Sequence, residues 1–109
     1  MSNPDSLPPP RVLIVDDDHT ARLLEREALE QTGFAVIEAC DGNEALAAVE
    51  HQPPDLMLLD VDMPGVDGFE VCRRVRQRWA ACDIPVIMVT GMDDLASINL
   101  AYEVGANDF

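Results

Sequence analysis

The chain has 109 residues, of which 21 are acidic and seven basic, so its formal net charge at pH 7 is −14. Every basic residue is arginine, and the chain contains no lysine. The length is that of one domain, and a hydrophobic content of 48% is enough to build a core. The negative charge argues against nucleic acid and anionic membrane surfaces as partners. No apolar run approaches the ~20 residues that span a bilayer.

The first ten residues contain four of the eight prolines, and we expect a flexible leader over residues 1–10 and one domain over residues 11–109. The chain has three cysteines, an odd number with no Cys-x-x-Cys pair, which favours reduced thiols and a cytoplasmic location. Of these, Cys72 and Cys82 are expected to be packing residues, and none of the three is expected to bind a metal.

Short apolar runs alternate with helical patterns along the domain. Buried strands are predicted over residues 11–15, 34–37, 56–59 and 84–89. Helices are predicted over 19–31, from Asp41 to the Pro53–Pro54 pair, from Asp67 to about Arg78, and over 93–104.

Three features of these helices can be predicted in more detail. In the first helix, Ala21, Leu24 and Ala28 share the face that we expect to pack inward. The second and third begin with Asp-x-x-Glu, the spacing of a capping box in which the aspartate is the N-cap. The arginines at 73, 74, 76 and 78 are expected to form a solvated face at the C-terminal end of the third helix.

Four alternations of strand and helix predict an α/β fold with an open, doubly wound parallel sheet and helices on both faces. The strands are almost continuously apolar, as is typical of parallel strands that are buried on both sides.

Acidic residues follow two of the predicted strands. Asp16, Asp17 and Asp18 follow the first strand, Asp60-Val61-Asp62 follows the third, and Thr90-Gly91 follows the fourth. Ligands of open α/β sheets bind at the carboxyl ends of the strands, so we expect these side chains to converge there. An acid after a strand is often a helix N-cap, and this is the alternative interpretation of Asp18.

Clustered carboxylates repel one another by roughly 1–4 kcal/mol per pair unless a proton or a cation neutralises them. A set of oxygen ligands favours a hard cation such as Mg²⁺. A carboxylate beside Mg²⁺ can also act as a nucleophile toward phosphorus, while a threonine hydroxyl donates to the transferring group. The strand ends therefore predict phosphoryl chemistry.

Four stretches together resemble the receiver domain of two-component response regulators. They are Val15-Asp16-Asp17, Leu58–Gly65 with Asp67-Gly68, Ile84–Gly91, and Val104–Phe109. The resemblance covers residues 11–109 and implies the flavodoxin-like strand order 2-1-3-4-5.

The resemblance also implies roles for individual residues. Asp60 would accept a phosphoryl group from the histidine of a sensor kinase or phosphotransfer protein. Asp17 and Asp60 would bind Mg²⁺ directly, Asp16 would bind it through water, and Asp62 would add its backbone carbonyl. Thr90 would contact the phosphoryl group and move on activation.

Three further positions carry implied roles. Phe109 stands at the position of the switch aromatic, and the side chains of Asp62 and Met92 would tune the rate of dephosphorylation. Receiver domains have a nearly universal lysine shortly beyond the position of Phe109, in a fifth strand. We therefore expect this chain to lack the fifth strand and helix, to leave residues 84–89 as an open edge, and to switch poorly. The alternative is that a second copy pairs with this edge.

The sequence leaves other functions open. A receiver-like interaction module without phosphorylation is one alternative. Another is a haloacid-dehalogenase-like phosphatase, which shares the Asp-x-Asp motif at Asp60-Val61-Asp62 but uses a longer chain with a cap and a lysine. Otherwise the domain is expected to be a phosphoacceptor and not a separate enzyme. Any output would follow it in the chain, and residues 88–98 resemble receivers fused to domains for cyclic-dinucleotide turnover.

Overall fold

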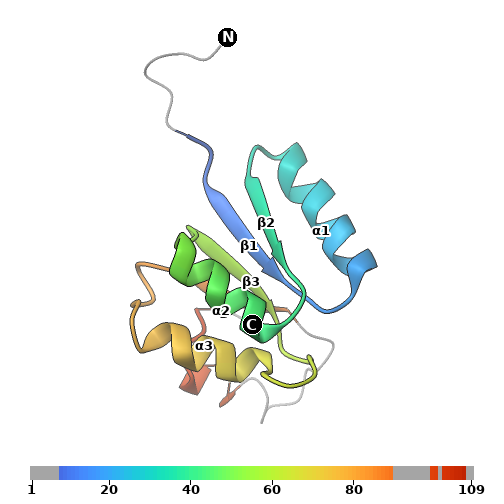
Figure 1. The fold of residues 1–109 in the computed structure, drawn as a ribbon. Helices are drawn as coiled ribbons and strands as arrows, with labels where there is room; N and C mark the ends of the chain where they lie inside the picture. The colour runs from blue at the N-terminus through green and yellow to red at the C-terminus, as the bar shows by residue number, and fades with distance from the viewer. Residues whose placement is uncertain (1–7, 90–98, 101, 108–109) are drawn as a thin grey trace.

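The computed structural model describes residues 8–89, 99, 100 and 102–107, and seven elements run through them (Figure 1). They are β1 (Arg11–Val15), α1 (His19–Gln31), β2 (Ala35–Ala39), α2 (Gly42–His51), β3 (Leu56–Asp60), α3 (Gly68–Arg76) and β4 (Val86–Val89). Residues 99, 100, 102 and 103 are helical, and the rest of the helix predicted over 93–104 is mostly outside the described residues. Within the described parts of the chain, we find no helix with the length and apolar character of a membrane span.

The four strands form one parallel sheet in the order β2-β1-β3-β4. Helix α1 covers one face, and α2 and α3 lie on the other (Figure 1). This arrangement confirms the predicted doubly wound sheet and the flavodoxin-like order of its first four strands. Because all strands run in the same direction, their carboxyl ends meet at one edge of the sheet.

The main hydrophobic core lies between the sheet and helices α2 and α3. Alternate residues of each strand point into it, as the two-residue period of a strand requires. The fully buried side chains of this core are Leu13, Val15, Ala39, Ala45, Val49, Met57, Leu59, Val61, Val71, Cys72, Val75, Ile84, Val86 and Met88. The prediction that Cys72 packs in the core is confirmed, whereas Cys82 is exposed and the prediction for it is wrong.

Helix α1 packs differently from the prediction. It contains no buried residue; Leu24 is 62% exposed and Ala28 is also exposed, while Ala21 is half-buried. The helix is rotated so that Arg22 and Arg26 reach Glu38 on β2, at 3.2 Å and 2.5 Å. Ion pairs from Arg22 and Arg26 therefore join this helix to β2, while Leu23 and Leu24 stay exposed.

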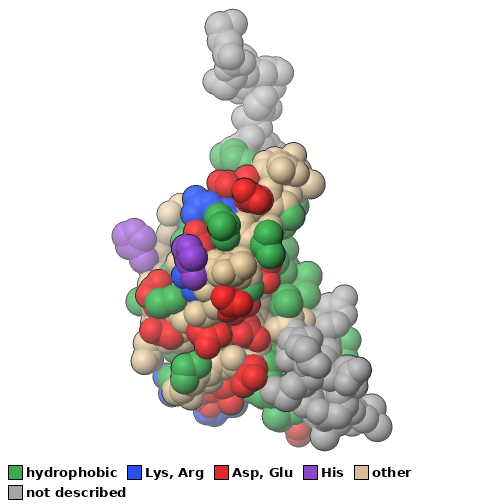
Figure 2. All heavy atoms as spheres, turned by 90° about the vertical axis from the view of Figure 1, so that its right-hand side faces the viewer, with side chains coloured by type: hydrophobic (Ala, Val, Ile, Leu, Met, Phe, Trp, Pro, Cys, Tyr) green, Lys and Arg blue, Asp and Glu red, His purple; other side chains and the backbone are tan. Residues whose placement is uncertain are grey.

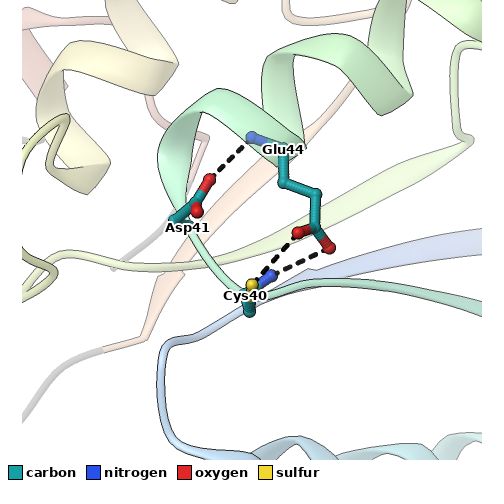
Figure 3. A group of neighbouring side chains, drawn as sticks. All are labelled: Cys40, Asp41 and Glu44. Carbon is teal, nitrogen blue, oxygen red and sulfur yellow. Dashed lines mark hydrogen bonds between the residues drawn. The ribbon is translucent and has the colours of Figure 1, made fainter.

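An aspartate precedes each of helices α1, α2 and α3, and its side chain accepts a hydrogen bond from a backbone N–H of the first turn. Asp18 accepts from Thr20, Asp41 from Glu44 and Asp67 from Glu70. In α2 the Glu44 carboxylate also accepts from the backbone N–H and the thiol of Cys40, at 3.3 Å and 3.0 Å (Figure 3). The predicted N-cap roles of Asp41 and Asp67 are confirmed, and Asp18 is a cap as well.

The contrast between the two faces predicts different costs for two leucine truncations. Leu59→Ala should lower the free energy of unfolding by about 2–5 kcal/mol, because Leu59 is fully buried and its loss leaves a cavity. Leu24→Ala should change it by less than about 0.5 kcal/mol. Urea unfolding of both variants measures the difference, and equal losses would show that α1 buries its leucines after all.

Candidate functional site

The register between β1 and β3 brings Asp16 beside Asp60. Val15 pairs with Leu59, so the next residue of each strand emerges at the same level of the sheet edge. Carboxylate oxygens of Asp16, Asp17 and Asp60 all lie within 4.8 Å of one another. The acids predicted to converge from the first and third strands do so, and we call these three residues the acid site.

Backbone turns hold two of these carboxylates in place. Asp16 is only 9% exposed, and its Oδ1 accepts a hydrogen bond from the Asp18 N–H at 2.9 Å. The Asp62 N–H donates to Oδ1 of Asp60 at 3.2 Å. Asp17 is exposed, and Asp18 turns away to cap α1. The acid site is thus two anchored carboxylates and one exposed carboxylate.

A close approach at Gly68 fixes the backbone behind Asp60. A Cβ atom at this position would lie 2.3 Å from the Asp60 carbonyl oxygen and 2.8 Å from Cα of Val61. The Gly68 N–H also donates to the Val61 carbonyl at 3.2 Å. Only glycine lets the start of α3 press this closely against the end of β3.

The surroundings of Asp60 make its charge unfavourable. Burial raises the pKa of the Asp60 carboxyl, and the neighbouring charges of Asp16 and Asp17 raise it further, to about 6, although the hydrogen bond from Asp62 opposes the shift. The charged form of Asp60 is therefore unfavourable in the acid site, and a proton or a bound cation would relieve this cost.

Two residues of α1 contribute to the site without any signal in the sequence. Burial raises the pKa of Glu25, and the charges of Asp16 and Asp60 raise it further, which places a fourth carboxylate in the field of the site. Arg22 donates from Nη1 to the Asp16 carbonyl oxygen at 2.7 Å. Both follow from the rotation of α1, which periodicity alone does not determine.

The acid site fits a hard divalent cation. Its donors are all carboxylate oxygens, two of them anchored, and this is the donor chemistry that Mg²⁺ prefers. Acidic side chains also gather on the molecular face that carries α1, which Figure 2 views directly. Such a field raises the local concentration of cations.

A second group, Cys40, Asp41 and Glu44, has ligand atoms equally close together. Here the helix cap explains the proximity (Figure 3). The hydrogen bond to Glu44 raises the pKa of the Cys40 thiol, whereas a metal ligand must be the thiolate.

The remaining predicted site residues lie in several places. Asp62 is exposed beside Asp60, and the role predicted for its carbonyl stays a prediction. Val89 pairs with Asp60 at the end of β4, so Thr90 is the next residue along the chain. Thr90, Met92 and Phe109 lie outside the described residues, and their predicted roles stay predictions.

The fold and the acid site together define a class of signalling domain, and comparison with known proteins agrees. The family model of the response regulator receiver domain matches residues 12–109. The chain therefore belongs to the receiver domain family of two-component response regulators.

Three relatives illustrate the similarity. The chain is 40% identical over 99 residues to the alkaline phosphatase synthesis transcriptional regulatory protein PhoP of Bacillus subtilis, covering 91% of this chain and 40% of that protein. Its fold is similar to that of the Vibrio cholerae chemotaxis protein CheY4, with a TM-score of 0.86, 32% identity, and coverage of 92% and 83%. A two-component system response regulator/GGDEF domain protein matches with a TM-score of 0.85 and 34% identity, covering 91% of this chain and 41% of that chain.

Removing the charge of Asp60 should stabilise the protein in the absence of divalent cations. The pKa of Asp60 is about 6 in the fold against an ordinary 3.8, so the folded state binds the proton more tightly than the unfolded state. Stability is then lost as the pH rises from about 4 to about 7. Asp60→Asn should remove this loss and, after solvent screening of a partly exposed group, add about 1–2 kcal/mol at pH 7.

Urea unfolding in chelator and in Mg²⁺ measures this effect. The wild-type protein should gain stability with Mg²⁺, and Asp60→Asn should gain less, because binding to the folded state is what stabilises. Glu27→Gln removes an exposed carboxylate of α1 outside the acid site and serves as the control. If Asp60→Asn were no more stable than this control in chelator, the repulsion in the acid site would be negligible.

Proposed function

We propose that Asp60 is the phosphoacceptor of this receiver domain. The observation that carries this proposal is the acid site, in which Asp60 is the partly buried member beside Asp16 and Asp17. A carboxylate at this position can attack phosphorus while its neighbours hold the cation that the reaction needs. Membership of the receiver family supports the same role.

In the proposed reaction, a carboxylate oxygen of Asp60 forms a bond to the phosphorus of a phosphohistidine on a partner protein. The bond from phosphorus to the imidazole nitrogen breaks, and the electron pair stays on the imidazole, which takes up a proton. Asp16, Asp17 and Asp60 would hold Mg²⁺, which would neutralise charge on the transferring group. Without it, three carboxylates would repel the incoming phosphoryl anion.

Further roles within the domain belong to the same proposal. Asp16 would hold the cation through water, and the Asp62 carbonyl would be a further ligand. Thr90 contacts the phosphoryl group, Phe109 responds to it, and the side chains of Asp62 and Met92 set how fast water removes it. The match to the receiver family over residues 12–109 supports these assignments, and the hydrogen bond from Asp62 to Asp60 supports a role for the loop after β3.

The chain is a signalling domain by family, and we propose that its chemistry is limited to its own phosphorylation and dephosphorylation. A haloacid-dehalogenase-like phosphatase would place its Asp-x-Asp motif after the first strand. Here that motif follows β3, while a separate acid pair follows β1. Steady hydrolysis of small phosphoesters by the purified chain would favour the phosphatase.

The partners proposed are a histidine kinase or phosphotransfer protein and an output domain, in the cytoplasm. The chain spans about 40% of the length of the curated relatives it matches. Those relatives are named as transcriptional regulators, and one structural neighbour is a GGDEF domain protein. We propose a C-terminal output of one of these two kinds, with cyclic-dinucleotide turnover as the candidate that residues 88–98 suggest. Pairing with a second copy through β4 is a further proposal.

Phosphorylation can be tested without a kinase. With Mg²⁺ and a small acyl phosphate, the protein should gain the mass of one phosphoryl group, and the gain should disappear with chelator and in Asp60→Asn. Intact-mass spectrometry measures it, and Glu27→Gln should retain it. A gain that persists in Asp60→Asn would exclude Asp60 as the acceptor. No gain in a protein that still binds Mg²⁺ would instead favour an interaction module that is not phosphorylated.

A further inference from the structure

The four arginines of α3 and its C-terminal end do not form one basic face. Arg73 and Arg74 both pair with Glu70, and Arg78 pairs with Glu50 and lies over the Trp79 ring, 4.8 Å from its centroid. These three side chains are 46–60% exposed. Arg76 is half-buried and makes no ion pair in the described part of the chain. The predicted solvated face is therefore wrong for Arg76.

Arg76 instead bonds to two other segments of the chain, the residue before Pro85 and the distant residues 105–107. Its Nε donates to the Gly105 carbonyl at 2.7 Å, and its Nη2 donates to Oδ1 of Asn107 at 2.7 Å. Its Nη1 donates to the Ile84 carbonyl at 2.8 Å. The planar fork of a guanidinium can meet three acceptors in fixed directions, which an ammonium group cannot do.

Asn107 continues this network to the edge of the sheet. Its backbone N–H donates to the Val86 carbonyl at 2.8 Å, and its Oδ1 accepts from the Val86 N–H at 2.9 Å. Both backbone groups of the first residue of β4 are thus bonded to Asn107. The same Oδ1 accepts from Arg76, so one side-chain oxygen joins α3 to β4.

The neighbouring residues are shaped for this contact. Gly105 has φ of +103°, and a Cβ atom there would lie 2.7 Å from Cγ of Arg76. Ala106 is 8% exposed and belongs to the main core. The Cys72 thiol donates to the Val104 carbonyl at 3.5 Å. Hydrogen bonds from Cys72 and Arg76 of α3 therefore reach residues 104, 105 and 107.

A charged group held only by carbonyl oxygens is costly to bury unless the bonds are well aligned. Arg76 is not needed to neutralise a carboxylate, because no acidic side chain is bonded to it among the described residues. What its bonds accomplish is to fix a segment of chain to the sheet edge.

We propose that Arg76 is a positioning residue: together with Asn107 it fixes residues 105–107 to the first residue of β4. We call this set of contacts the Arg76 clamp. It sets the position of residues 105–107 relative to α3 and to the start of β4. The proposal does not depend on phosphorylation of Asp60, which lies at the opposite end of the strands.

Amide hydrogen exchange on the whole chain tests the clamp. In Arg76→Met, which keeps the stem and removes every donor, the Asn107 and Val86 amides should exchange at least about tenfold faster. The Leu13 and Ile14 amides, in β1, should change by less than about twofold, because β1 does not pair with β4 and the loss is local. The matched control Arg78→Met should leave the Asn107 amide within about twofold of wild type.

Unchanged protection of the Asn107 amide in Arg76→Met would overturn the proposal. So would an equal loss at Leu13 and Ile14, which would show general destabilisation in place of local positioning. Arg76→Lys, which keeps the charge with a single donor nitrogen, should restore only part of the protection.

Asn107 variants decide the matter if Arg76→Met does not fold. Asn107→Asp keeps an oxygen acceptor for Arg76 and Val86 and should retain protection of the Val86 amide. Asn107→Leu removes that acceptor and should lose it by at least about tenfold. Equal exchange of the Val86 amide in these two variants would contradict the clamp.

Discussion

The repulsion among three carboxylates at the end of the sheet is the constraint around which this domain is organised. Asp16 and Asp60 are brought together by the pairing of β1 with β3, which the hydrophobic core enforces through Leu13, Val15, Met57 and Leu59. The burial that stabilises the strands therefore also forces like charges together. Burial of the Asp60 carboxyl and the charges of Asp16 and Asp17 together raise the pKa of Asp60, and a proton or a cation would relieve that cost.

Some neighbouring residues hold the carboxylates of the acid site in place, and others leave the site open to solvent. Hydrogen bonds from Asp18 and Asp62 hold the two inner carboxylates, and Gly68 lets α3 brace the backbone of Asp60. Asp17 stays exposed, and acidic side chains gather on the face that carries α1 (Figure 2). At its other end α3 carries Arg76, so a helix of nine residues contacts both the acid site and the segment that precedes Phe109.

The sequence was sufficient to predict what depends on strand order and strand ends. Alternating apolar runs predict the parallel sheet, and parallel strands necessarily bring Asp16 and Asp60 to one edge. The rotation of α1 could not be predicted in this way, because its alanines and leucines surround the helix and its arginines suit either a solvated or a bonded position. Glu25, Arg22 and Arg76 were missed for this reason: their partners lie on other elements, and only tertiary structure determines which way a long side chain turns.

The attachment of α1 through Glu38 has a consequence for the behaviour of the domain in acid. The hydrogen bond from Arg26 holds the pKa of the Glu38 carboxyl below its usual range, so this tie is present at neutral pH and weakens as Glu38 becomes protonated. Protonation of Asp60 has the opposite sign, because it relieves the crowded carboxylates at the start of the same helix. Acidification thus weakens the contact of α1 with Glu38, while it reduces the repulsion among the carboxylates that precede the helix. Salt acts on the same two places, screening the ion pairs that secure the helix and the like charges that strain the strand ends.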